Sequence, residues 1–186
     1  MSRSPHMRRQ TLAVIPAALL MATTATLATP AHSAPQKEPT ATLVTNVTFQ
    51  ILDHEDFGSN VHCTRNSQSR DTVRYLPRGF FYSGKCGGEI RVELDFRAAL
   101  TSNSAVIIQS GHVKFFEGAS ENTDDQDGGL TFGYTGEPQT IIPAKESRTR
   151  TFYVENNDEG EPDDHATVTV TWTNIKNYQL RRIPTH

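Results

Sequence analysis

Carboxylates are concentrated in the segment ENTDDQDGG, residues 121–129, which holds four acidic side chains and no basic one. Within it, Thr123, Asp125 and Asp127 alternate along the chain just before Gly128. Alternate side chains of an extended chain point the same way, and calcium takes six to eight oxygen ligands. The pattern is similar to the front half of a D-x-D-x-D-G calcium loop, although Thr stands at the first ligand position and the later Glu is missing.

A second acidic segment, ENNDEGEPDDH at residues 155–165, adds Asp158, Asp163 and Asp164 as candidate calcium ligands. If both segments lie at one end of the fold, a bound calcium ion would relieve the repulsion among their carboxylates. The alternative is that both are solvated turns, because Asp, Asn and Gly are ordinary turn residues. Any calcium bound here is expected to have a structural role.

The opposite charge dominates residues 64–85, which contain five Lys or Arg and one acid, Asp71. The segment lies between Cys63 and Cys86, so a disulfide between these cysteines would tether it. Arginine and aromatic side chains are enriched in binding surfaces. The candidates for binding a cell-wall polymer, a carbohydrate or another secreted protein are Arg74, Tyr75, Arg78 and Tyr82. The alternative is that the aromatic side chains face the core and the arginines face water.

The N-terminus predicts export. Residues 1–34 have a basic start, an apolar middle and a small-residue end, as a secretory signal peptide has. Cleavage after Ala31, Ser33 or Ala34 fits this pattern, and the Arg8-Arg9 pair loosely resembles a twin-arginine signal. No other stretch is long and apolar enough to span a bilayer. The protein is therefore expected to be secreted and extracellular.

The exported part is acidic and holds both cysteines. Without the three arginines of residues 1–34, 15 of the 18 Lys and Arg remain against 21 Asp and Glu, a formal charge of −6. This balance disfavours nucleic-acid binding by the whole surface. Two cysteines in an oxidising compartment are expected to pair as Cys63–Cys86. A free catalytic thiol is the competing interpretation.

An alternation of apolar and polar residues positions these loops. It is clearest at residues 41–52, 89–100 and 165–174, where Leu43, Ile90 and Trp172 are among the expected core residues. Period-two alternation predicts strands with one buried and one wet face, as in antiparallel sheets. Weaker strands are expected at 71–76, 79–83, 128–136, 139–144 and 148–156, and a hairpin is expected at 104–118 around Ser110-Gly111.

These strands predict an all-β antiparallel sandwich of eight or nine strands, with a small β-barrel as the alternative. The expected organisation is a signal peptide at 1–34, a disordered leader at 35–41, one domain at 42–180 and a tail at 181–186. The segments FFEGASENTDDQDG and NNDEGEPDDHATVTVTWTN resemble small secreted β-sheet proteins of filamentous actinobacteria over about residues 110–174. The resemblance implies compartment and fold, and it implies no activity.

Motifs for catalysis are lacking. The histidines do not form an H-E-x-x-H pattern, and no G-x-S-x-G elbow occurs. The sequence therefore favours a non-catalytic secreted module. If the acidic segments bind calcium, the ion would stabilise this module. The first alternative is a binding protein or inhibitor that uses the basic aromatic segment. The second is a small secreted hydrolase, because the separation of the many carboxylates is not readable from the sequence.

Overall fold

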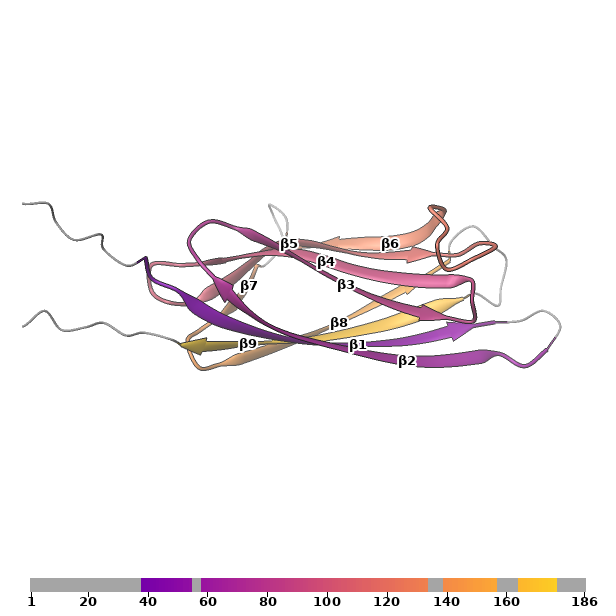
Figure 1. Cartoon of the computed structure of the whole chain (residues 1–186), viewed down its shortest axis with the longest axis horizontal. Helices are drawn as coiled ribbons and strands as arrows, with labels where there is room; N and C mark the ends of the chain where they lie inside the picture. The colour runs from indigo at the N-terminus through magenta and orange to yellow at the C-terminus, as the bar shows by residue number, and fades with distance from the viewer. Residues whose placement is uncertain (1–37, 55–57, 134–138, 157–163, 177–186) are drawn as a thin grey trace, which may run out of the picture. The chain divides into compact units, whose positions relative to one another are not determined.

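The computed structural model describes residues 38–54, 58–133, 139–156 and 164–176. These residues belong to one compact unit and form nine β-strands without a helix. The strands make two separate antiparallel sheets that pack face to face (Figure 1). The prediction of an all-β sandwich is therefore confirmed, and the barrel alternative is wrong for the part of the chain described.

Sheet A has the strand order β2-β1-β9-β8, and sheet B has the order β3-β4-β5-β6 with β7 also paired to β5. The strands are β1 Ala41–Asp53, β2 Val61–Val73, β3 Arg78–Cys86, β4 Ile90–Leu100, β5 Val106–Phe116, β6 Gln126–Phe132, β7 Thr140–Ile142, β8 Ser147–Glu155 and β9 His165–Lys176.

Alternation along the strands builds the core. In β1, Leu43, Val47, Phe49 and Ile51 are buried, and the residues between them are less buried or exposed, apart from Thr45. β4 buries Ile90, Val92, Leu94 and Phe96 in the same way, and β9 buries Ala166, Val168, Val170 and Trp172. Each set turns toward the other sheet because successive side chains of a strand point to opposite faces. These predicted core faces are confirmed.

An aromatic cluster joins the two layers. Phe96 of sheet B stacks on Phe80, with ring centroids 4.9 Å apart, and meets Trp172 of sheet A edge-to-face at 5.4 Å. Phe132 of β6 stacks on Phe152 of β8 at 4.5 Å. Offset-stacked and edge-to-face arrangements are the preferred geometries of aromatic pairs. The cluster therefore fixes how the sheets pack as well as burying apolar area.

The edge strands β2 and β3 close one side of the sandwich. Cys63 of β2 and Cys86 of β3 form a disulfide across the two sheets, which confirms the predicted pairing. Arg65 donates from Nε to the carbonyl oxygen of Lys85 at 3.0 Å. Gly84 lets β3 approach β1, since a Cβ at this position would lie 2.8 Å from the Phe49 ring. Unpaired edges invite strand addition, and these contacts protect both edges.

Two sequence expectations about strands were wrong. Residues 104–118 are not a hairpin, because β5 runs unbroken through Ser110 and Gly111. Gly111 serves close packing instead: a Cβ there would lie 2.2 Å from the Phe132 ring and 2.6 Å from the Asp95 carbonyl oxygen. The strand expected at 71–76 ends at Val73, and it belongs to a long polar strand that begins at Val61.

Over the residues that the structure describes, no helix is long and apolar enough to cross a membrane.

Candidate functional site

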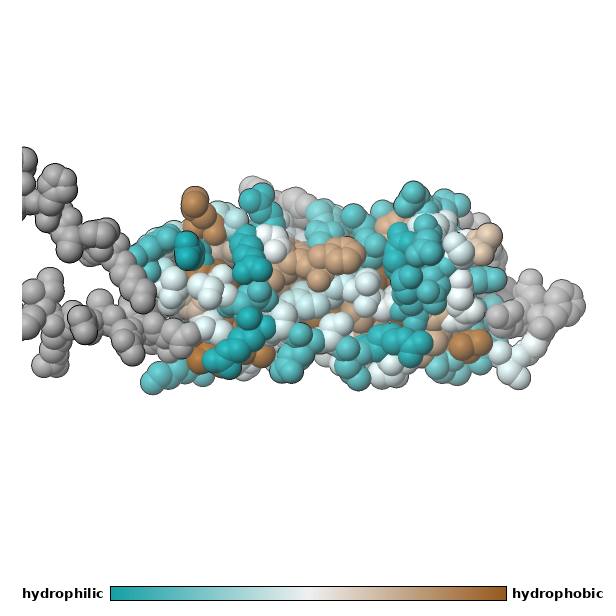
Figure 2. All heavy atoms as spheres, in the orientation of Figure 1, coloured by the Kyte–Doolittle hydropathy of each residue, from teal (hydrophilic) through white to brown (hydrophobic). Residues whose placement is uncertain are grey.

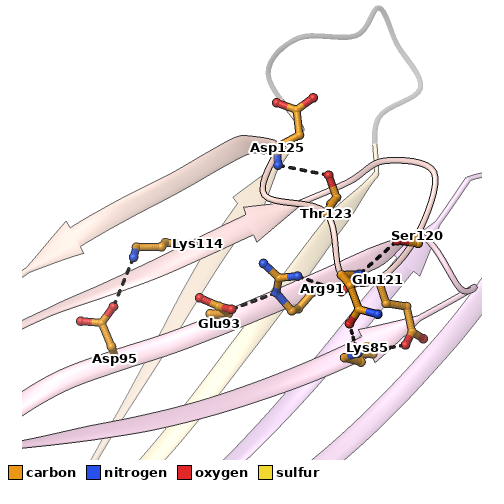
Figure 3. A network of polar contacts seen from close by, with 10 residues as sticks. Lys85, Arg91, Glu93, Asp95, Lys114, Ser120, Glu121, Thr123 and Asp125 are labelled. Carbon is orange, nitrogen blue, oxygen red and sulfur yellow. Dashed lines mark hydrogen bonds and ion pairs between the residues drawn. The ribbon is translucent and has the colours of Figure 1, made fainter.

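The first part of the acidic segment, residues 121–125, forms a compact turn before β6 that rests on sheet B (Figure 3), and the segment continues into β6. Lys85 pairs with Glu121 at 3.2 Å, and Arg91 donates from Nη1 to the carbonyl oxygen of Glu121 at 2.8 Å. The backbone N–H of Glu121 donates to the carbonyl oxygen of Gly88 at 2.8 Å. The turn is therefore held by two bases of sheet B and by the β3–β4 turn.

Two of the predicted ligands in this segment, Thr123 in the turn and Asp127 in β6, accept hydrogen bonds from backbone N–H groups. Thr123 accepts a hydrogen bond at Oγ1 from the backbone N–H of Asp125 at 3.1 Å. Asp127 accepts one at Oδ2 from the backbone N–H of Glu117 at 2.8 Å. Figure 3 shows the Asp125 carboxylate pointing away from Glu121 and from the strands. Short side-chain acceptors that bond the nearby backbone are typical of turns.

The two acidic segments share one end of the sandwich. The Asn156 side chain donates from Nδ2 to Glu117 at 2.9 Å, and the Asn156 backbone N–H donates to the carbonyl oxygen of Asp164 at 2.9 Å. The buried Asp164 carboxylate accepts a hydrogen bond from the backbone N–H of His54. Asp158 and Asp163 lie outside the described residues. Among those that are described, no three His, Cys, Asp or Glu side chains are grouped to hold a metal ion.

The basic segment divides between the core and the surface. Tyr82 is buried, and its hydroxyl shares a 2.6 Å hydrogen bond with Ser69. Its ring belongs to the Phe96 cluster, so this candidate is a packing residue. Arg74, Tyr75 and Arg78 are exposed where the chain crosses from β2 to β3.

We call Arg74, Tyr75, Leu76 and Arg78 the basic tip. Leu76 is 79% exposed and Tyr75 is 43% exposed. Arg74, Leu76 and Arg78, together with Thr72, line a hollow of about 260 Å³. Arg78 pairs with Asp71 at 3.0 Å, and Arg74 approaches Glu38 at 3.7 Å. Leu76 was not among the residues predicted from the sequence. Its position between Tyr75 and Pro77 in a turn was the one signal that could have predicted its exposure.

The basic tip and the acidic segments lie at opposite ends of the sandwich. In β1, Ala41 pairs with Val73, which precedes the basic tip, whereas Leu52 pairs with His165, which is the last residue of the second acidic segment. Figure 1 shows the β2–β3 connection on the left and the β5–β6 loop on the right. We call these the tip end and the acidic end.

Charge follows this division. At the tip end, six described cations are exposed against three described acids, Glu38, Asp71 and Glu146; the cations are Arg70, Arg74, Arg78, Arg97, Lys145 and Arg148. The side in view in Figure 2 is mainly hydrophilic, with separate hydrophobic spots. The exposed leucine therefore stands in a locally basic setting on a protein whose total charge is negative.

A second hollow lies on the outer face of sheet A near the acidic end, and sequence reasoning missed it. It measures about 230 Å³, and its lining comes from β1, β2 and β9: Gln50, Ile51, Leu52, His62, Cys63, Thr64, His165 and Thr167. The only sequence signal was the alternation of Thr in residues 165–174. That alternation does not predict which strands pair with β9 on its two sides.

Compared with protein-family models and with curated proteins, the chain matches none.

Proposed function

We propose that the protein is a secreted, non-catalytic module that binds an anionic cell-surface polymer through the basic tip. The observation that carries the proposal is that Arg74 and Arg78 line one hollow with the exposed Leu76, at the end that has six exposed described cations and lies opposite the acidic segments. The Cys63–Cys86 disulfide supports an extracellular location, because disulfides persist in oxidising compartments.

The charge distribution supports an oriented encounter with a polyanion. A protein with a net negative charge repels anionic polymers over most of its surface. Among the described residues, only those of the tip end show an excess of cations, so it is the end that such a polymer approaches. Exposed charges are screened by salt beyond about 10 Å at 0.1 M ionic strength, and binding should therefore weaken as salt rises.

The side chains of the basic tip suit such a contact. Arginine presents a planar fork of donors that binds carboxylate or phosphate groups in pairs. The existing Arg74–Glu38 contact is long, at 3.7 Å, and both side chains are largely exposed. Exposed ion pairs of this kind contribute little, so a polyanion can displace Glu38 from Arg74 at small cost. Tyr75 and Leu76 add apolar area beside the charges.

The test is retention of the protein on immobilised polyphosphate. We expect retention at low salt, and we expect Arg74→Ala with Arg78→Ala to weaken binding by about tenfold, which corresponds to about 1.4 kcal/mol. The matched control is Arg65→Ala with Lys114→Ala, which removes the same charge away from the tip end. Absence of retention, or equal weakening in both double variants, would contradict the proposal.

Calcium stabilisation of the acidic end is a separate prediction. An ion that binds only the folded state raises stability by about 2.7 kcal/mol at 100 times its dissociation constant. We expect millimolar calcium to raise the melting temperature by roughly 5–10 °C relative to EDTA, with magnesium at the same ionic strength as the control. The rise should vanish in Asp125→Asn with Asp127→Asn. A melting temperature that is the same with calcium and with EDTA would leave the acidic segments as solvated turns.

A further inference from the structure

The outer face of sheet A carries an ordered set of uncharged polar side chains. Three successive rows cross all four strands: one from Gln68 to Thr149, one from Asn66 to Thr151 and one from Thr64 to Tyr153. These rows contain seven Thr, four Asn or Gln and one Tyr, and none of the twelve side chains is buried. Three rows of hydroxyl and amide groups thus face outward with no Asp, Glu, Lys or Arg among them.

Cross-strand hydrogen bonds hold this face in place. The Thr149 and Thr171 hydroxyls are 2.8 Å apart, and Thr48 donates to the Asn66 side chain at 2.8 Å. Threonine is stiff at χ1 because it is β-branched. A hydroxyl has one donor and two acceptor sites, so each retains capacity for a ligand. Binding to such a pre-organised face costs little side-chain entropy.

The outer face of sheet B is an internal comparison, because it meets the same solvent. There, Arg91 pairs with Glu93 at 2.8 Å and Lys114 with Asp95 at 3.7 Å (Figure 3). Water alone therefore does not explain the uncharged rows of sheet A. Removing a charged group from water is costly unless it is paired. The three rows, which lie between Arg70 and Glu155 on the same face, avoid this cost when they are covered by a ligand that is also uncharged and rich in hydroxyl groups.

The hollow defined above adds a shaped site at the edge of these rows. Its side chains combine amide, hydroxyl and imidazole groups with Leu52. Beside it, Tyr153 is 53% exposed, and its ring lies 5.5 Å from the His165 ring, centroid to centroid. Sugars present both hydroxyl rims and apolar C–H faces. An exposed aromatic ring with a polar tip can pack against the C–H face while its neighbours bond the hydroxyls.

We infer that the outer face of sheet A binds a neutral polysaccharide, with a sugar ring in the hollow against Tyr153 and the chain lying over the threonine rows. This site is independent of the basic tip, because it lies on a different surface and recognises an uncharged ligand. The ligand class follows from the absence of charge in the three rows, the paired hydroxyls and the exposed ring.

The experiment is affinity electrophoresis of the purified protein through gels that contain cellulose derivatives without charge, soluble β-1,3-glucan, soluble chitin oligomers, dextran or mannan. We expect retardation by at least one of these glycans, and little change when salt is raised. Tyr153→Ala should weaken the binding about tenfold. Thr149→Val with Thr171→Val keeps the strand shape and removes two hydroxyls, and it should weaken binding as well.

Phe81→Ala is the matched control, since Phe81 is an aromatic residue that is 61% exposed on the outer face of sheet B. It should leave the retardation unchanged, as should Arg74→Ala with Arg78→Ala. Migration unaffected by every neutral glycan would overturn the inference, and so would equal effects of Tyr153→Ala and Phe81→Ala. Loss of neutral-glycan binding in the basic-tip variant would likewise overturn the independence of the two sites.

Discussion

Replacement of Phe96 by alanine is expected to destabilise the protein by about 3–5 kcal/mol, as truncation of a buried aromatic residue does. Phe96 is fully buried and touches aromatic rings of both sheets, with Phe80 on one side and Trp172 on the other. Its loss removes apolar contacts and leaves a cavity between layers that the surrounding strands cannot close. The effect is a large fraction of the 5–15 kcal/mol that stabilises an ordinary domain.

Urea unfolding measures this loss. Trp172 is the single tryptophan of the chain and is buried next to Phe96, so its fluorescence reports unfolding directly. Phe81→Ala is the control, because Phe81 is exposed on the other side of sheet B, and its replacement should change stability by only about 0.5 kcal/mol. Similar losses for Phe81→Ala and Phe96→Ala would show that the aromatic cluster does not hold the sheets together.

Removal of the disulfide is the second large effect. The cysteines are 23 residues apart, and closing a loop of this length restricts the unfolded chain by about 3 kcal/mol in the chain-entropy model. We expect the double variant Cys63→Ala, Cys86→Ala to lose about that amount and to melt roughly 10 °C lower. The bond also joins the edge strands of the two sheets, so its loss should loosen the side that β2 and β3 close.

Two comparisons separate these contributions. Reduction of the unmodified protein should reproduce the loss in the double variant, because both release the same loop. Hydrogen exchange should then rise most in β2 and β3, since local opening concentrates where contacts are few. An unchanged unfolding midpoint in the double variant would mean that the polar contacts of Arg65 and Ser69 suffice to hold the edges.

The strands with alternating patterns were predictable, and the polar edge strand was not. β4 and β9 bury every second residue, so their sequences report the direction of the core. β2 borders sheet A and exposes most of its residues, so its sequence lacks the apolar alternation. Gly111 was wrongly predicted to lie in a turn. A glycine in the sequence indicates either a turn or a close approach of other atoms, and only the position of Phe132 in the structure distinguishes the two.

The candidate sites, like the strands, were predicted only in part. The disulfide was predicted from two cysteines in a segment that is expected to be exported, and it is present. The basic segment contributes Arg74 and Arg78 to one exposed surface, while Tyr82 turns inward because it alternates with the exposed Phe81. The spacing of Asp125 and Asp127 is compatible both with a calcium loop and with a turn. In the structure the nearby backbone N–H groups bond Thr123 and Asp127.

The sequence by itself determined the fold class, the inward face of each patterned strand and the cysteine pair. These properties are local: the alternation of side chains follows from the extended backbone, and pairing was expected from the cysteine count and the predicted compartment. Only the tertiary structure decided that the basic tip and the acidic segments lie at opposite ends, and that the threonines of β9 stand in rows with polar residues of β1, β2 and β8. Those arrangements depend on which strands pair and in what register, and contacts between residues far apart in the chain settle both.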